Sequence, residues 1–288
     1  MLLYLNRLLR LLNPIPYVRA ISTLSHTLAR NRYLLQDMAK RDIKDQYLGR
    51  GLGVVWAVIQ PIFLIAVYLT AFMYIFKIKL TGAAGEIKPM DDLALYVISG
   101  IIPFLACQTV LTKSTSILTA NANLVKQVVF PIEVLPIKIM ASAFLMQVIC
   151  TLMMLGYMLY TFHMIPVTAL LLPAAIILQY VFLAGCSMLL SVLSPFLQDI
   201  NELVSMACTV LLYATPIFYN MNMLPVSLHP IILLNPFTHL LNCYRDAFYH
   251  AELAHGLSWL IMLVLSLLIL GLGARLFGKL KVLLGNVL

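Results

Sequence analysis

Residues 139–198 read IMASAFLMQVICTLMMLGYMLYTFHMIPVTALLLPAAIILQYVFLAGCSMLLSVLSPFLQ, a run of 60 positions without Asp, Glu, Lys or Arg. As one helix, at ~1.5 Å per residue, this stretch would be ~90 Å long, about three times the thickness of a bilayer hydrocarbon core. The chain must therefore fold back at least once inside the stretch. This predicts a membrane protein that crosses the bilayer several times.

The composition of the whole chain supports the same class. Of 288 residues, 62% are hydrophobic and only 10% are charged, whereas soluble domains carry about 25% charged residues. This excludes an ordinary soluble domain and a disordered chain. The net charge of +8 does not indicate a nucleic-acid partner, because no soluble domain is large enough to present a basic surface. The five cysteines form no C-x-x-C pair and are expected to be small buried apolar side chains.

Uncharged windows predict an all-α fold with six transmembrane helices, and an even number of spans places both termini on one side. Fifteen of the 19 Lys and Arg residues fall on that side, so the positive-inside rule predicts cytoplasmic termini. The predicted organisation is a cytoplasmic or interfacial segment, 1–53, followed by a membrane domain, 54–280. The predicted windows are 54–76, 93–112, 139–160, 167–193, 203–219 and 257–274.

Residues 30–48, RNRYLLQDMAKRDIKDQYL, predict an amphipathic helix that lies along the cytoplasmic interface. Apolar residues recur on one face, and charged residues fall opposite them. Two interpretations stay open at this point. The helix is either a positively charged anchor at the membrane surface or a docking surface for a cytoplasmic partner.

Residues 220–256 predict short helices that re-enter the outer leaflet and form an outer gate. The segment is rich in proline, which excludes one straight helix. It is also too apolar for a free loop in water, since no charged residue occurs between Glu202 and Arg245. Irregular backbone at membrane depth is tolerated only against protein or a water-filled cavity. The residues assigned to this gate are Pro225, Pro230, Asn235, Pro236 and Arg245.

The motifs of an enzyme, a metal site or a nucleotide site are missing from the sequence. There is no H-E-x-x-H and no G-x-S-x-G, and the six histidines do not have the spacing of helical metal ligands. Residues 273–280 match G-x-x-x-x-G-K, but Leu280 replaces the required Ser or Thr, so no phosphate loop is expected. No acidic residue lies inside a predicted span, which disfavours a proton- or sodium-driven carrier. The energy source is therefore expected on another polypeptide.

Aromatic side chains are the candidates to line a transport pathway. Tyrosine and tryptophan combine an apolar ring, which stacks on sugars, with a polar tip that forms hydrogen bonds. The alternative is that they are ordinary packing residues or part of an interfacial aromatic belt. The candidates are Trp56, Tyr68, Phe72 and Phe76 in the first span, and Tyr213, Phe218 and Tyr219 in the fifth.

Several blocks together resemble type-2 ABC exporter permeases for polysaccharides, above all those for O-antigen and teichoic acid. The blocks cover roughly 40–246. They are Arg41-Asp42-Ile43-Lys44 with Tyr47, Gly53, Trp56 and Pro61; Asn123-Leu124-Val125-Lys126 with Phe130-Pro131-Ile132-Glu133-Val134-Leu135-Pro136; Pro195 to Asp199-Ile200; and Thr215-Pro216-Ile217-Phe218-Tyr219, Leu224-Pro225 and Leu234-Asn235-Pro236-Phe237-Thr238-His239 to Tyr244-Arg245-Asp246. One departure is Gln198, where relatives often carry Arg, and this change would alter a salt bridge at the cytoplasmic mouth.

The resemblance implies a homodimer in the bacterial inner membrane, with one channel between the protomers. It also implies two copies of a separate ABC ATPase, which carry ATP and Mg, so that this chain needs no cofactor of its own. The substrate would be a polysaccharide linked to undecaprenyl diphosphate, in contact with membrane lipid and not with nucleic acid. The helix 30–48 and the loop 117–130 would meet the ATPase. Residues expected to contact the lipid headgroup or the ATPase are Arg41, Lys44, Arg50, Asn123, Lys126 and Glu133.

Three functions compete at this stage. The leading one is the membrane subunit of an ATP-driven polysaccharide exporter, with no catalytic residue of its own. The second is a type-2 ABC exporter of drugs or lipids, because an aromatic lining also suits such substrates. The third is a membrane enzyme that acts on lipid-linked sugars, for which Arg245 and Asp246 are the only acid–base candidates on the outer side.

Overall fold

The computed structural model describes residues 15–47, 55–71, 90–126, 130–249 and 252–287. All regular structure in these residues is helical, which confirms the all-α prediction. The α-helices are α2 (Ile15–Arg30), α3 (Arg32–Tyr47), α4 (Trp56–Leu69), α5 (Met90–Ala120), α6 (Ala122–Val125), α7 (Val134–Phe162), α8 (Leu172–Leu193), α9 (Ile200–Ala214), α10 (His229–Leu234), α11 (Pro236–Phe248) and α12 (Gly256–Val287). The 3₁₀ helices are η3 (Val167–Leu171), η4 (Ser194–Phe196), η5 (Met221–Met223) and η6 (Val226–Leu228).

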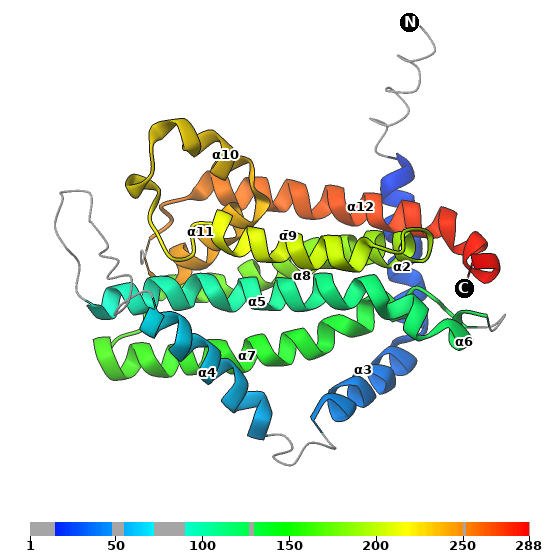
Figure 1. Ribbon diagram of the computed structural model, residues 1–288, viewed down its shortest axis with the longest axis horizontal. Helices are drawn as coiled ribbons and strands as arrows, with labels where there is room; N and C mark the ends of the chain where they lie inside the picture. The colour runs from blue at the N-terminus through cyan, green and yellow to red at the C-terminus, as the bar shows by residue number, and fades with distance from the viewer. Residues whose placement is uncertain (1–14, 48–54, 72–89, 127–129, 250–251, 288) are drawn as a thin grey trace, which may run out of the picture.

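Four long apolar helices form the body of the protein and run side by side (Figure 1). The segments Leu93–Ala120, Val134–Phe162, Val167–Phe196 and Gly256–Gly285 are each 28–30 residues long and apolar enough to cross a bilayer. They correspond to the second, third, fourth and sixth predicted windows. At one end of this bundle lie α2, α6 and the last turns of α12, and at the other lies α10; we call these the α6 end and the α10 end (Figure 1).

The first and fifth predicted windows give shorter helices in the described residues. The apolar part of α4, Ile59–Leu69, and the whole of α9 are each under 18 residues. Window 203–219 was wrong at its end, because α9 stops at Ala214 and Thr215 is extended (φ −87°, ψ 138°). The following residue is Pro216, whose ring disfavours helical backbone at the residue before it. Residues 72–76 of the first window lie outside the described part.

Helices α8 and α12 are joined by glycines that bring their backbones into contact. A Cβ placed on Gly185 would lie 2.4 Å from the carbonyl carbon of Ile269 and from the nitrogen of Leu270. A Cβ on Gly273 would lie 2.4 Å from the carbonyl oxygen of Gly185. Small residues at a helix crossing permit this approach inside a membrane, where close packing replaces the hydrophobic effect between helices. The crossing fixes α12 against the centre of the bundle.

A hydrogen-bonded cluster of buried amides and a tyrosine ties the middle of the bundle together. The Gln147 side-chain nitrogen donates to Gln179 Oε1 (2.9 Å) and to the Tyr244 hydroxyl (2.6 Å). That hydroxyl donates in turn to Gln179 Oε1, and Gln179 Nε2 donates to the carbonyl of Pro103 (3.1 Å). These residues come from α5, α7, α8 and α11. The cluster therefore holds the non-spanning helix α11 onto three of the long helices.

The N-terminal part of the described chain forms two helices, whereas one helix over 30–48 was predicted. Helix α3 agrees with that prediction in its bounds, while its place at the membrane interface stays a prediction. Helix α2 was not anticipated, and the chain turns at Asn31 between the two helices. Figure 1 shows α2 crossing the α6 end, steeply inclined to the long helices. Leu24 of α2 is buried against Phe277 and Ala274 of α12. Both helices fall within the predicted N-terminal segment.

Candidate functional site

Four of the predicted aromatic residues lie together where α4 approaches the end of α9. The Phe218 ring lies 5.4 Å from the Tyr68 ring and 6.3 Å from the Tyr213 ring, measured between centroids. Phe218 is buried, with 2% of its surface exposed, and Tyr213 is 58% exposed. The Tyr219 hydroxyl donates to the carbonyls of Tyr213 (3.2 Å) and Ala214 (3.1 Å). We call Tyr68, Tyr213, Phe218 and Tyr219 the aromatic cluster.

The other aromatic candidates do not join this cluster in the described structure. Trp56 is half-buried at the start of α4, and Tyr68 follows 12 residues later, which places the two ~18 Å apart along the helix. Phe72 and Phe76 lie outside the described residues. The predicted aromatic stripe along the first span is therefore observed only at Tyr68.

Apolar side chains beside the aromatic cluster face outward on α4 and α9. On α9 they recur with helical spacing, so that they lie on one face together with Tyr213. The exposed residues are Ile59, Ile62, Phe63 and Val67 on α4, and Leu203, Met206 and Val210 on α9. In a membrane protein, such faces are covered either by lipid chains or by another protein surface.

Arg245 is the centre of the predicted outer gate. It is 3% exposed, and its guanidinium lies 3.6 Å from the centroid of the Tyr96 ring. It donates hydrogen bonds to the carbonyls of Pro216 and Ile217, where the chain leaves α9. Burial lowers the pKa of Arg245 from its ordinary value, and neighbouring tyrosines, Tyr96 first, raise it again. The cation thus links α11, α5 and the end of α9.

Asn235 makes a second link between α11 and the end of α9. Its Oδ1 accepts a hydrogen bond from the backbone of Phe237 (3.0 Å), which caps the N-terminus of α11. Its Nδ2 donates to the hydroxyl of Thr215 (2.9 Å). One amide side chain therefore fixes both the start of α11 and the residue at which α9 stops.

The prolines of the gate segment each begin a short helix. Pro225 precedes η6, Pro230 lies in the first turn of α10, and Pro236 is the first residue of α11. Proline suits these positions because its missing N–H would have no partner in a first turn. Pro225 and Pro230 are exposed and Pro236 is half-buried. Short helices therefore occupy the described part of 220–256, as predicted, while their re-entry into the outer leaflet stays a prediction.

Asp246, the neighbour of Arg245, is also buried but has other partners. Its carboxylate accepts hydrogen bonds from the His255 backbone (3.1 Å), His255 Nδ1 (2.8 Å) and Trp259 Nε1 (3.1 Å). Arg245 and Asp246 are thus each engaged with different partners and do not face a common space. They do not form the acid–base pair that a membrane enzyme would need.

Basic candidates on α3 lie at the surface of the α6 end. Arg41 is exposed and pairs with Asp37 one turn earlier (2.9 Å), and Lys44 is exposed. Arg50 lies outside the described residues. Asp42, between the two cations, points inward to the buried Lys138 of α7 (3.3 Å). This ion pair attaches α3 to the long helices and leaves its basic face outside.

Of the three residues predicted in and beside the loop, two are exposed and the third forms an ion pair. Asn123 and Lys126 are exposed on α6 and at its end. Glu133, at the start of α7, accepts a hydrogen bond from Lys281 of α12 (2.6 Å). Glu133 therefore ties α7 to α12, while Asn123 and Lys126 are accessible to another chain.

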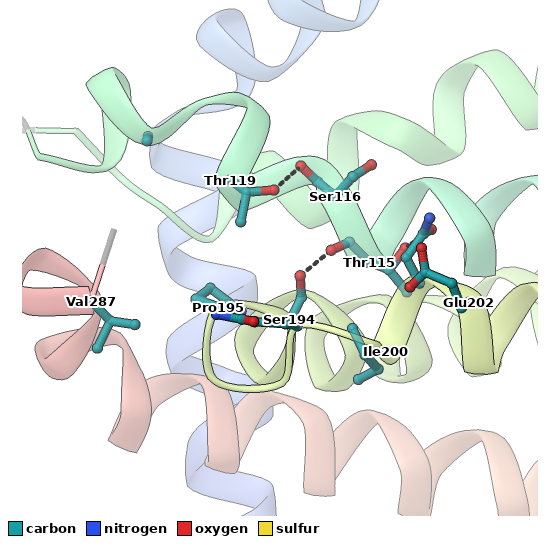
Figure 2. A pocket seen from close by; sticks show the side chains of 11 residues that line it. Thr115, Ser116, Thr119, Ser194, Pro195, Ile200, Glu202 and Val287 are labelled. Atoms are coloured by element: carbon teal, nitrogen blue, oxygen red, sulfur yellow. Dashed lines mark hydrogen bonds between the residues drawn. The ribbon is translucent and has the colours of Figure 1, made fainter.

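An open cavity of about 550 Å³ lies next to this surface, between the end of α5, η4 and the start of α9 (Figure 2). Its walls include Glu202 and Gln198, the position at which the sequence departs from its family pattern. The Thr115 hydroxyl donates to Asn201 (2.7 Å), and Ser194 donates to the carbonyl of Thr115. Gln198 and Glu202 thus share this wall with hydrogen-bonded hydroxyl and amide groups.

Sequence reasoning missed the residues that hold this arrangement together. Gln147 and Gln179 are amides inside apolar runs, where they signal contacts between helices. Lys138 and Lys281 were counted only as positive charges, and their partners lie far away in the sequence. Among the described residues, no group of three His, Cys, Asp or Glu side chains lies close enough to hold a metal ion.

Comparison with known proteins gives consistent matches over most of the chain. Residues 33–249 match the family model described as ABC-2 type transporter. The chain is 27% identical over 252 residues to an O-antigen export system permease protein of Klebsiella pneumoniae, covering 86% of this chain and 92% of that protein. It is 23% identical to the O-antigen export system permease protein of Myxococcus xanthus, covering 85% and 92%. It is 21% identical to a polysialic acid transport protein of Escherichia coli, covering 81% and 88%.

Proposed function

Because the chain belongs to the ABC-2 type transporter family, we propose that it is the membrane permease of an ATP-driven exporter that moves a lipid-linked polysaccharide out of the cytoplasm. The observation that carries the proposal is the match over 33–249, together with relatives named for the export of O-antigen and polysialic acid. The chain itself is not an enzyme, and ATP is hydrolysed on a separate ATPase subunit.

The transport pathway is formed between two copies of this chain. The exposed apolar faces of α4 and α9 support this proposal, because a second copy would bury both. The aromatic cluster lies where these two faces meet, so dimerisation would place two sets of rings around a common axis. Aromatic faces with hydroxyl tips stack on sugar rings and are tolerant of different sugars.

The ATPase acts on the α6 end. Helix α3 and residues 122–126 present exposed polar and basic side chains there, among them Arg41, Lys44, Asn123 and Lys126. Force applied to α3 would pass through the ion pair of Asp42 and Lys138 (3.3 Å) to α7. Force applied near α6 would pass through Glu133 and Lys281 (2.6 Å) to α12.

The α6 end faces the cytoplasm of a bacterial cell, with both termini on that side of the inner membrane. The described Lys and Arg residues support this orientation, because all of them except Arg245 lie toward the α6 end. The gate around Asn235 and Arg245 then closes the pathway at the outer surface. The cargo is a polysaccharide linked to undecaprenyl diphosphate, and the basic face of α3 attracts the diphosphate.

The test is co-purification of this chain with its ABC ATPase partner, followed by measurement of ATP hydrolysis and of polymer export. We expect a complex with two copies of each subunit, and export that stops when the ATPase is deleted. Export that continues without the ATPase would refute the proposal. If cells that lack the transporter accumulate a small drug or a free lipid, and still export polymer normally, the chain would instead belong to a drug or lipid exporter of the same family.

A matched pair of variants tests the aromatic cluster. Tyr213→Ala is expected to reduce polymer export several-fold while the complex and its basal ATP hydrolysis stay intact, because it removes an exposed ring of the proposed lining. Tyr160→Ala is the control, since Tyr160 is also an exposed tyrosine but lies on α7 and is not a member of the cluster. Equal export by both variants would contradict the assignment of the lining.

A further inference from the structure

A cavity of about 240 Å³ lies between α2 and α12 at the α6 end, away from the aromatic cluster. Three basic side chains line it: Arg19 from α2, and Arg275 and Lys281 from α12. Glu133 is the one acidic residue in the wall. We call this cavity the α2–α12 pocket. Its basic side chains come from two helices that meet at a steep angle, so the positive charge gathers only in the folded protein (Figure 1).

The charges in the pocket do not cancel. Lys281 is paired with Glu133 at 2.6 Å, which neutralises one cation. In the part of the chain that the structure describes, neither Arg19 nor Arg275 forms an ion pair with a carboxylate. The Arg275 guanidinium lies 4.9 Å from the centroid of the Tyr17 ring, an arrangement that positions the cation without neutralising it. Two arginines without a carboxylate partner therefore line one cavity, which carries positive charge in excess.

The floor of the pocket is apolar. Leu24, Met188, Ala274 and Phe277 line it and are buried in the cluster that joins α2, α8 and α12. A ligand that fills the pocket would thus meet two arginines at the rim and apolar side chains beneath them. This combination fits a molecule with an anionic head and an apolar body.

We propose that the α2–α12 pocket binds the phosphate of an anionic glycerophospholipid from the surrounding bilayer. The planar fork of arginine matches phosphate oxygens with two parallel hydrogen bonds, and two arginines match one such headgroup. Basic pockets between membrane helices on the cytoplasmic side commonly hold anionic headgroups. This assignment goes beyond the export function, because it concerns a lipid that stays with the protein.

The position of the pocket favours bilayer lipid over the exported carrier. Its walls come from α2, α8, α12 and Glu133 at the start of α7. None of these elements carries a member of the aromatic cluster, which lies on α4 and at the end of α9 and just after it. A lipid in the pocket would fasten α2 to α12 and would lie beside the Glu133–Lys281 ion pair without entering the transport pathway.

The test measures lipid retained by the purified full-length chain, using native mass spectrometry after delipidation and addition of defined lipids. The probes are phosphatidylglycerol, phosphatidylcholine with the same chains, and undecaprenyl diphosphate. We expect the wild type to retain phosphatidylglycerol in preference to phosphatidylcholine, with undecaprenyl diphosphate failing to displace it. Arg275→Gln should weaken retention about ten-fold, the factor that matches the loss of one hydrogen bond to a charged group. Arg275→Lys should retain part of the affinity.

Two further variants separate binding from folding and from overall charge. Lys279→Gln removes one charge from the exposed surface of α12 outside the pocket and should bind as the wild type does. Thr23→Trp, at an exposed position of α2 in the pocket wall, should fill the cavity and lower retention without a change of charge. Equal retention of the two phospholipids, or unchanged binding by both Arg275→Gln and Thr23→Trp, would overturn the proposal. Displacement of phosphatidylglycerol by undecaprenyl diphosphate would overturn it in favour of a carrier site.

Discussion

Gly185→Ala tests the contact that holds α12 against the bundle. The new methyl group would lie 2.4 Å from the carbonyl carbon of Ile269 and from the nitrogen of Leu270. Both atoms belong to the backbone of α12, so no side-chain rotation relieves the clash. Ordinary contact begins near 3.4 Å, and the two helices must therefore move apart by about 1 Å at the crossing.

The size of the effect follows from two opposing contributions. Overpacking in a well-packed interior typically costs about 1–3 kcal/mol, and the upper end applies here because backbone atoms must move. Alanine is favoured over glycine inside a helix by ~1 kcal/mol, which offsets part of the loss. We expect a net destabilisation of about 2 kcal/mol. At about 2–4 °C per kcal/mol for chains of 150–250 residues, Tm would fall by roughly 4–8 °C.

The measurement is the Tm of the purified protein in detergent, followed by the loss of the monodisperse peak on size-exclusion chromatography. Gly156→Ala is the matched control, because a methyl group added to Gly156 of α7 would meet no neighbouring atom within 4 Å. The control should melt at or above the wild-type temperature. If Gly185→Ala has the same Tm as the wild type, the α8–α12 contact is not as close as described, and the reasoning fails.

Three other variants, one of them double, probe the gate, the core and the basic face of α3. Asn235→Ala should cost about 1 kcal/mol of stability through loss of the α11 cap and should raise leakage through the permease; unchanged Tm and leakage would contradict its linking role. Tyr244→Phe should cost about 1–3 kcal/mol, because two buried amides lose a shared hydroxyl, whereas Tyr160→Phe on the surface should leave Tm unaltered. Arg41→Gln combined with Lys44→Gln should lower export with the ATPase still bound, as measured by transport and pull-down; loss of the ATPase would make these residues docking contacts.

Hydropathy was sufficient to predict the helical class and the four long spans. It works because lipid forces backbone groups to bond within each segment, so a long uncharged run has few alternatives to a helix. The end of α9 was missed because the window counted apolar residues and ignored the effect of Pro216 on Thr215. Helix α2 was missed because its importance lies in the contact of Leu24 with α12 and not in an uncharged run.

The types of residue in the candidate site could be predicted from the sequence, but the contacts between residues far apart in the chain could not. Tyr68, Tyr213 and Phe218 were selected as aromatic residues of two spans, and the structure brings these three rings together. The ion pair of Glu133 and Lys281 joins residues 148 positions apart. Nothing local marks such a pair, because its formation depends on how α7 and α12 pack.

The glycine contact between α8 and α12 also determines when α8 can find its partner helix during synthesis. Gly273 follows Gly185 by 88 positions, so at ~5–20 residues per second the ribosome needs about 4–18 s to make the second glycine after the first. During that interval the surface of α8 at Gly185 lacks its partner helix α12. A translational pause within those 88 codons would prolong the exposure of this surface of α8. An insertase or chaperone that binds the surface would shorten its exposure. Synonymous codon changes in this part of the gene would therefore alter the yield of folded protein without a change in its amino-acid sequence.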